Sequence, residues 1–196
     1  MVPRQTLLPR AQPQLSFGAR LNTVSCAASR SDGYGFDMLL DRDAGYFFGA
    51  YVAEGWAGGG RRGAKVLQIA VTDPALIAHL DRILVRWGVP HGIRERYMFV
   101  HCAALARLVV QHCGRLAANK RVPDLLWQQP REFIEGFLDG YWSGDGTVSS
   151  KQLTASTASR TLAEGLCFLL ASFNVKAGYR VYPKAGHQDQ HLVNVY

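Results

Sequence analysis

The sequence has 196 residues, 48% of them hydrophobic and 19% charged, which supports one domain or two small ones and excludes a chain that is disordered throughout. Its net charge is +7, and 17 of the 22 basic residues are arginines, which favours a nucleic-acid partner, with an ordinary basic enzyme as the alternative. A membrane span, a secretory signal and a zinc or disulfide cluster are all absent from the sequence pattern, so we expect free thiols in a reducing cytoplasm.

The first part of the chain contains two regions. Residues 1–40 are polar and weakly patterned, and we assign them to an N-terminal extension of uncertain structure. The following region, 41–113, is a first subdomain, because its apolar residues recur at helix spacing around alternating strand patterns. Its expected elements are a helix at 43–54, strands near 56–58 and 65–72, a helix at 74–87, strands near 91–96 and 97–101, and a helix at 103–113.

The second part of the chain repeats this order after a linker at 114–130. In the second subdomain, 131–196, we expect helices near 131–144 and 159–173 and strands near 147–149, 151–157, 177–182 and 191–196. The repeat is visible at a shift of 91 positions in the first helices and 86 in the second ones. The fold class is therefore α+β, with two pseudo-symmetric αββαββ(α) subdomains, the second without a counterpart of the helix 103–113.

Small residues form a stripe on the first helix of each subdomain. They recur at intervals of four, which places them on one helix face: Gly45, Gly49 and Ala53 in the first copy, and Gly136, Gly140 and Gly144 in the second. Glycine inside a helix costs about 0.5–1 kcal/mol relative to alanine, so two such stripes need a structural reason. We expect the two helices to pack against each other along the stripes, backbone to backbone.

An acidic residue and a glycine end both stripes. Packing of the two helices makes Glu54 and Asp145 neighbours at helix C-termini, where the helix dipole is negative. Two clustered carboxylates suit Mg²⁺, which takes a few carboxylates together with water and phosphate oxygens. Beside a basic surface, this indicates metal-assisted phosphodiester hydrolysis. In the alternative interpretation, the two acids are merely solvated helix ends.

These segments resemble the LAGLIDADG, or dodecapeptide, motifs of homing endonucleases, in their two-motif, single-chain form. The stretch Lys120-Arg121-Val122-Pro123 resembles a lysine-containing segment of the intein-encoded members. The resemblance implies that Glu54 and Asp145 bind Mg²⁺, with Mn²⁺ as a substitute, and that Lys120 assists at the cleavage centre. A second auxiliary basic residue cannot be assigned from the sequence.

The resemblance also implies the partner and the products. The expected partner is double-stranded DNA with a long, largely asymmetric site, bound by a monomer and cut across the minor groove to leave short 3′ overhangs. The protein would act inside a prokaryotic or phage-infected cell, without membrane contact. A non-cleaving DNA-binding regulator or an RNA maturase of the same family is the alternative, and the retained carboxylates argue against it.

A β-sheet saddle would hold the DNA. Strand alternation predicts which side chains face it, and the candidates are polar or basic: Arg61, Arg62, Gln68, Arg94, Arg96, Gln152, Thr154, Ser156, Arg180 and Tyr182. Residues 41–130 carry 12 basic and 7 acidic residues, whereas 131–196 carry 6 of each. We therefore expect the first subdomain to hold DNA more tightly.

Overall fold

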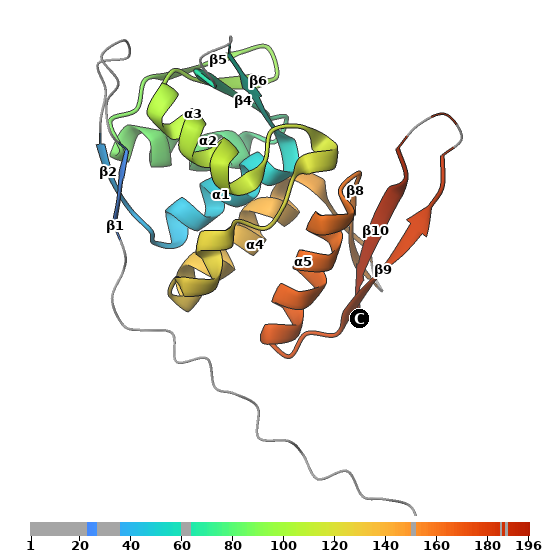
Figure 1. Ribbon diagram of the computed structural model, residues 1–196. Coiled ribbons are helices and arrows are strands. Elements are labelled where there is room, and N and C mark those ends of the chain that lie inside the picture. Colours follow the sequence, from blue (N-terminus) through green and yellow to red (C-terminus); the bar gives the residue numbers. More distant parts are fainter. Residues whose placement is uncertain (1–22, 27–35, 60–63, 150–151, 185, 187) are drawn as a thin grey trace, which may run out of the picture.

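A computed structural model describes residues 23–26, 36–59, 64–149, 152–184, 186 and 188–196. Two antiparallel four-stranded sheets flank a central pair of helices, α1 (Arg42–Glu54) and α4 (Arg131–Asp145) (Figure 1). The contact between α1 and α4 is the most extensive between any two of the described elements. No helix in the described ranges is long and apolar enough to cross a membrane.

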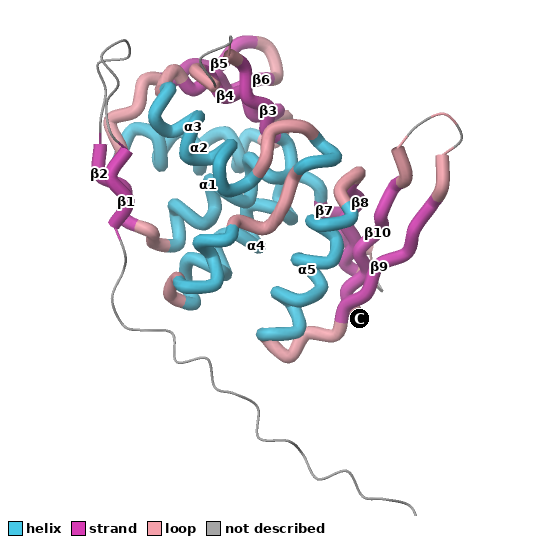
Figure 2. Tube along the Cα trace, viewed as in Figure 1, coloured by secondary structure: helices cyan, strands magenta, loops and turns pink. Residues whose placement is uncertain are grey.

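The two halves repeat one topology (Figure 2). The first half consists of α1, β3 (Gly55–Gly58), β4 (Val66–Ala70), α2 (Pro74–Arg86), β5 (His91–Arg94), β6 (Tyr97–Val100) and α3 (Ala103–Cys113). The second consists of α4, β7 (Gly146–Val148), β8 (Leu153–Thr157), α5 (Arg160–Ser172), β9 (Ala177–Tyr182) and β10 (Gln190–Val195). The strand orders β3-β4-β6-β5 and β7-β8-β10-β9 are equivalent, which confirms the predicted fold class of two pseudo-symmetric subdomains.

Local sequence signals fix the second helix of each half. The side chain of Asp73 accepts a hydrogen bond from the Ala75 amide at the start of α2, and Ser159 accepts one from Leu162 at the start of α5. After the two helices, Gly88 and Asn174 adopt the left-handed conformation, with φ of 63° and 60°. Glycine and asparagine tolerate this conformation, so both helices end at corresponding places.

Strand alternation buries one face of each sheet against the helices. Leu67, Ile69 and Val71 are at most 2% exposed in and after β4. In β8, Ala155 and Thr157 occupy the corresponding buried positions, and Leu153 is half-buried. The residues that alternate with these buried ones therefore lie on the outer faces of the sheets.

Two regions contain structure that the sequence pattern did not specify. Within the N-terminal 40 residues, β1 (Thr23–Cys26) pairs with β2 (Phe36–Leu39), and Met38 and Leu40 are buried in the core. The linker contains two short 3₁₀ helices, η1 (Ala117–Asn119) and η2 (Asp124–Gln128). Because Lys120, Val122 and Leu126 are buried, the linker is packed into the molecule rather than only connecting its halves.

Candidate active site and nucleic-acid interface

The stripes of small residues bring α1 and α4 into backbone contact. A Cβ atom added at Gly49 would overlap the carbonyl oxygen of Phe137, and one added at Gly140 would overlap that of Tyr46. The same clash with the opposite backbone occurs at four of the five predicted stripe glycines: Gly45, Gly49, Gly136 and Gly140. Any larger side chain would therefore force the two helices apart.

The contact continues to the C-terminal ends of both helices. A Cβ atom at Gly144 would lie 2.7 Å from Cβ of Ala53 and 2.9 Å from Cγ of Glu54. Both helices end at the next acidic residue, Glu54 in α1 and Asp145 in α4. The structure thus brings together the two carboxylates that the sequence singled out as metal ligands.

The surroundings of Asp145 disfavour its charged form. Burial, and secondly the nearby Glu54 carboxylate, raise the pKa of the Asp145 carboxyl to about 7, and Lys120 opposes the shift. The negative end of the α4 dipole lies at the same place. A cation bound between the two acids would relieve this repulsion.

Lys120 lies near Asp145 and lines the same cavity. It is 3% exposed, and its Nζ donates a 2.6 Å hydrogen bond to the carbonyl oxygen of Tyr51 and lies 3.3 Å from the centroid of the Tyr51 ring. Burial lowers the pKa of Lys120 to about 7, against the opposing effects of Cys113 and Asp145. The Ser159 hydroxyl donates to the Lys120 carbonyl oxygen at 2.6 Å and so ties this segment to the start of α5.

Each of the two carboxylates lines a cavity of its own. The Asp145 cavity, of about 300 Å³, is lined by residues that include Trp56, Arg115, Lys120, Asp145 and Ser156. The Glu54 cavity, of about 330 Å³, is lined by Glu54, Ala70, Thr72, Arg96 and Tyr97. Each cavity therefore combines one carboxylate with at least one cation, the combination that hydrolysis of a phosphodiester needs.

Two of these lining residues were missed by sequence reasoning. Arg115 lies two residues after the end of α3, and its Nε donates to the carbonyl oxygen of Ala57 at 2.9 Å. Trp56, 46% exposed, occupies the first outward position of β3. The only sequence signal for Arg115 was its place among the basic residues that flank Lys120 in the linker. Trp56 could have been indicated by the inward–outward alternation of β4, because Trp56 pairs with the outward-facing Gln68.

The outer face of the first sheet carries two of the predicted DNA-facing residues. Gln68 pairs across the sheet with Trp56 on one side and Phe99 on the other. Arg94 pairs with Tyr97 and lies on the same face, because directly paired residues in antiparallel strands point to one side. Gln68 and Arg94 are thus exposed to a ligand that covers this sheet.

The outer face of the second sheet carries four more. Ser156 and Arg180 flank Leu192 in one cross-strand row, and Thr154 and Tyr182 belong to neighbouring rows of the same face. The chemistry of this face is mostly hydroxyl and aromatic, with Arg180 as a cation. Hydroxyl groups can bond to phosphates or to base edges.

The remaining four candidates lie elsewhere. Gln152 belongs to the β7–β8 turn, where its carbonyl oxygen accepts a hydrogen bond from the Ser149 amide. Arg96 lies in the β5–β6 turn, at the edge of the Glu54 cavity rather than on the sheet face. Arg61 and Arg62 fall outside the described residues.

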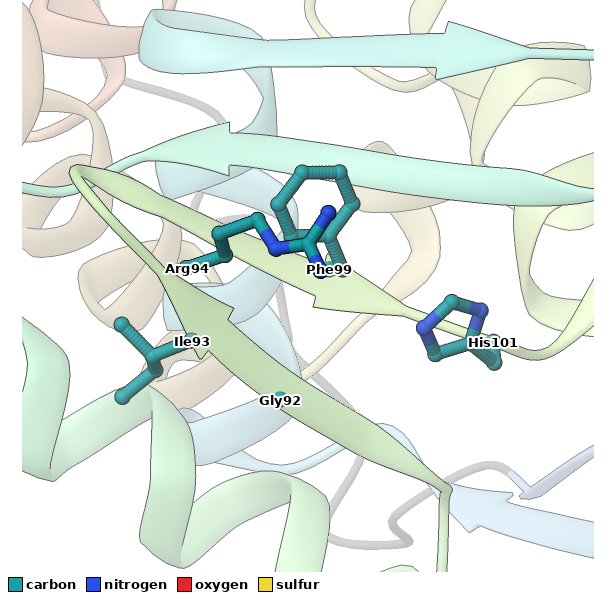
Figure 3. Close-up of a pocket in the computed structure, with 5 residues that line it drawn as sticks. All are labelled: Gly92, Ile93, Arg94, Phe99 and His101. Carbon is teal, nitrogen blue, oxygen red and sulfur yellow. The ribbon is translucent and has the colours of Figure 1, made fainter.

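A further hollow of about 400 Å³ lies on the first sheet (Figure 3). Its walls are Gly92, Ile93, Arg94, Phe99 and His101. Gly92 pairs with Phe99 across the two strands and contributes no side chain to the hollow. Arg94 and His101 add polar groups to this apolar floor, which suits a contact with the edge or methyl group of a base. Phe99 and His101 were not among the residues predicted from the sequence.

Comparisons of sequence identify related proteins. The model of the LAGLIDADG-like domain family matches residues 132–196. A DNA polymerase of Thermococcus litoralis is 32% identical over 159 residues, which is 74% of this chain and 9% of the polymerase. The DNA-directed RNA polymerase subunit Rpo1C of Methanocaldococcus jannaschii is 27% identical over 149 residues, 71% of this chain and 17% of that protein. The chain thus spans less than a fifth of the length of these curated relatives.

Comparison with solved structures shows that homing endonucleases share the fold of this chain. A crystal structure of I-DmoI in complex with DNA and Mn matches with a TM-score of 0.58 at 10% identity, over 80% of this chain and 90% of that one. The homing endonuclease I-WcaI bound to its DNA recognition sequence matches with a TM-score of 0.57 at 17% identity, over 79% and 75%. The fold that the motif resemblance implied is therefore confirmed.

Proposed function

We propose that this chain, a two-motif protein of the LAGLIDADG family, is a site-specific double-stranded DNA endonuclease. The observation that carries the proposal is the pair Glu54 and Asp145 at the touching ends of α1 and α4, each lining a cavity of its own. Each cavity would receive one scissile phosphate. A chain that only binds nucleic acid has no need for two carboxylates that repel each other.

The residues present fit a divalent metal. The pair offers only carboxylate oxygens, and the described residues contain no group of three or more His, Cys, Asp or Glu side chains that could enclose an ion. Mg²⁺ suits such a site, because it keeps several waters and shares phosphate oxygens with its substrate, and Mn²⁺ would substitute. Bound there, Mg²⁺ would activate water and neutralise charge on the departing oxygen.

The chain's own groups would perform the remaining work. Lys120, held in the lining of the Asp145 cavity by Tyr51 and Ser159, would stabilise negative charge on the phosphate that enters this cavity. The outer faces of the two sheets would lie in the major groove on either side of the cut. Cutting across the minor groove would leave short 3′ overhangs. The DNA site would be long and largely asymmetric, since the two outer faces carry different side chains.

We infer that the chain corresponds to an endonuclease segment carried within host proteins, as in inteins. Its relatives include a DNA polymerase and an RNA polymerase subunit, of which it matches only 9% and 17%. Two hosts with different reactions share this segment, so its chemistry is separate from theirs. The location would be that of the DNA, inside the cell. Sequencing of the surrounding gene tests the inference, because splice-junction residues should flank the segment in the same reading frame.

The decisive experiment is selection of a cleaved site from a randomised duplex library in Mg²⁺. We expect one preferred site, cut in both strands. Asp145→Asn and Glu54→Gln should each slow cleavage by at least about 100-fold, because a lost ligand removes several kcal/mol of transition-state stabilisation. Asp139→Asn, at an exposed carboxylate on the same helix, is the matched control and should cleave normally. Tight binding of a duplex with no cleavage in Mg²⁺ or Mn²⁺ would instead support a regulator or an RNA maturase.

A further inference from the structure

The two cavities beside the carboxylate pair are related by the internal repeat. Ala70 and Thr72 line the Glu54 cavity, and their counterparts at a shift of 86 positions, Ser156 and Ala158, line the Asp145 cavity. The walls of the two cavities are therefore equivalent in the fold. Their cations are not equivalent, because they come from different elements.

The Asp145 cavity takes its cations from the linker, which passes the molecule only once. Lys120 and Arg115 both belong to this segment and both line this cavity. The Glu54 cavity has Arg96 as the basic residue of its lining. Arg96 comes from the β5–β6 turn and not from the linker. The repeat alone therefore does not indicate that Arg96 occupies a place in the Glu54 cavity comparable to that of Lys120 in the Asp145 cavity.

The backbone of the β5–β6 turn holds Arg96 in place. Glu95 adopts a left-handed conformation with φ of 54°, which makes the turn sharp. The carbonyl oxygen of Arg96 accepts a 2.8 Å hydrogen bond from the Val71 amide, directly after β4. The guanidinium carbon lies 5.5 Å from the centroid of the Tyr97 ring, which supports the side chain. Within the described ranges, Arg96 forms no ion pair with a carboxylate, so its charge is available to a ligand.

We propose that Arg96 is a catalytic residue for one DNA strand, contacting the scissile phosphate in the Glu54 cavity, while Lys120 serves the other strand. This inference rests on the proposed function. In the reaction, a water oxygen forms a bond to phosphorus and the bond from phosphorus to the 3′ oxygen breaks. The water gives a proton to solvent and the 3′ oxygen takes one, leaving a 5′ phosphate and a 3′ hydroxyl. Arg96 forms no covalent bond, and its planar fork pairs with two non-bridging oxygens as their charge grows.

A simple anchoring role for Arg96 predicts a different result. A residue that only holds the DNA backbone contributes to binding affinity. Its substitution slows the cutting of both strands equally, and only at enzyme concentrations that no longer saturate the DNA. A residue that contacts one scissile phosphate slows one cut even when all of the DNA is bound. The distinguishing measurement is therefore the rate for each strand at saturating enzyme.

The experiment uses the full chain and its selected site, with a different dye on each strand, under single-turnover conditions in Mg²⁺. We expect Arg96→Ala to slow one strand by about 100-fold and to accumulate nicked duplex. Lys120→Met should slow the opposite strand, and Arg96→Lys should recover part of the lost rate. Arg94→Ala, two residues away on β5 and lining the other hollow, is the matched control. It should weaken binding without changing the ratio of the two strand rates.

The outcomes separate the two proposals. If the wild-type protein cuts no duplex, the proposed function fails and this inference fails with it. If the wild type cuts both strands and Arg96→Ala slows them equally, or slows neither, only the assignment of Arg96 is wrong. Thermal unfolding and DNA affinity in Ca²⁺ show whether each variant is folded and bound, and Arg96→Lys keeps the test valid if the alanine variant does not fold.

Discussion

At the scale of single residues, Asp145 links stability to catalysis. Its pKa in the folded protein is raised from 3.8 to about 7, first by burial and then by Glu54. A raised carboxyl pKa means that the folded state binds the proton more tightly, so this group lowers stability as the pH rises from about 4 to about 7. Asp145→Asn should therefore unfold at a higher temperature than the wild type at pH 8, and at nearly the same temperature at pH 4.

A divalent metal should reverse the difference in unfolding temperature between the wild type and Asp145→Asn at pH 8. Because Mg²⁺ would bind only the folded wild type at this site, it should raise the wild-type unfolding temperature at pH 8 and leave that of Asp145→Asn nearly unchanged. Thermal melts with and without the metal provide the measurement. The control is Asp139→Asn, whose carboxylate is exposed and pairs with Arg42. A wild type that gains no stability from any divalent ion at pH 8 would contradict metal binding by the pair.

Ser159 is a positioning residue for Lys120. Its buried hydroxyl accepts from the Leu162 amide at 3.1 Å and donates to the Lys120 carbonyl oxygen at 2.6 Å. Ser159→Ala should cost about 1–2 kcal/mol of stability, since it removes the helix cap and leaves buried groups without a partner. It should also slow cleavage of the strand served by Lys120 more than that of the other strand, a bias that lost stability alone does not produce. Ser172→Ala, at the far end of α5, should show neither effect.

Residue identities were predictable from the sequence where the repeat, strand alternation or the motif resemblance marked them. Glu54 and Asp145 are equivalent positions of two copies, and the structure places them together. The linker has no second copy to compare, so Lys120 was indicated by the motif resemblance alone and the nearby Arg115 was not predicted. The place of Arg96 beside Glu54 depends on where a two-residue turn ends in space, a tertiary property that strand alternation does not encode.

At the scale of elements, the glycine stripes make the α1–α4 contact intolerant of any side chain. A methyl group at Gly140 would overlap the backbone of α1 at Tyr46, and backbone cannot rotate away as a side chain can. Gly140→Ala should therefore cost about 3 kcal/mol or more, in spite of the better helix propensity of alanine. Gly178→Ala in β9 is the matched control, because a Cβ atom there meets nothing within 4 Å. Chemical denaturation measures both, and equal stabilities would contradict close packing of the helices.

Elements were predictable where the apolar period was long. The amphipathic helices α2 and α5 extend over 13 residues each, with caps at their ends, so period and capping agree. The β1–β2 pair escaped prediction because β2 is only four residues long, and Met38 is the buried one among the three side chains of this strand that the structure describes. The burial of that strand comes from contact with the rest of the core and not from its own sequence.

At the scale of the whole molecule, the charge distribution is less symmetric than the fold. Residues 41–130 carry 12 basic and 7 acidic residues, whereas 131–196 carry 6 of each. The two sheets are equivalent in topology, so both half-sites should be covered, but by unequal charge. Release of counterions scales with the number of phosphates neutralised, and the slope of affinity against salt measures that number. The DNA half-site under the first sheet (β3-β4-β6-β5) should therefore account for the larger part of the slope of affinity against salt.

Neutral methylphosphonate linkages, placed in one half of the selected site at a time, test this expectation. Neutralising one half should flatten the salt dependence more than neutralising the other. Arg94→Gln identifies which half-site lies under the first sheet. On unmodified DNA, the loss of one phosphate contact should lower the salt slope by about one. On DNA whose phosphates facing β5 are already neutral, the same substitution should have little effect. Arg180→Gln on β9 should show the complementary behaviour. Equal slopes from both halves would mean that the basic excess of residues 41–130 lies away from the DNA, and that the sheets hold their half-sites as symmetrically as they fold.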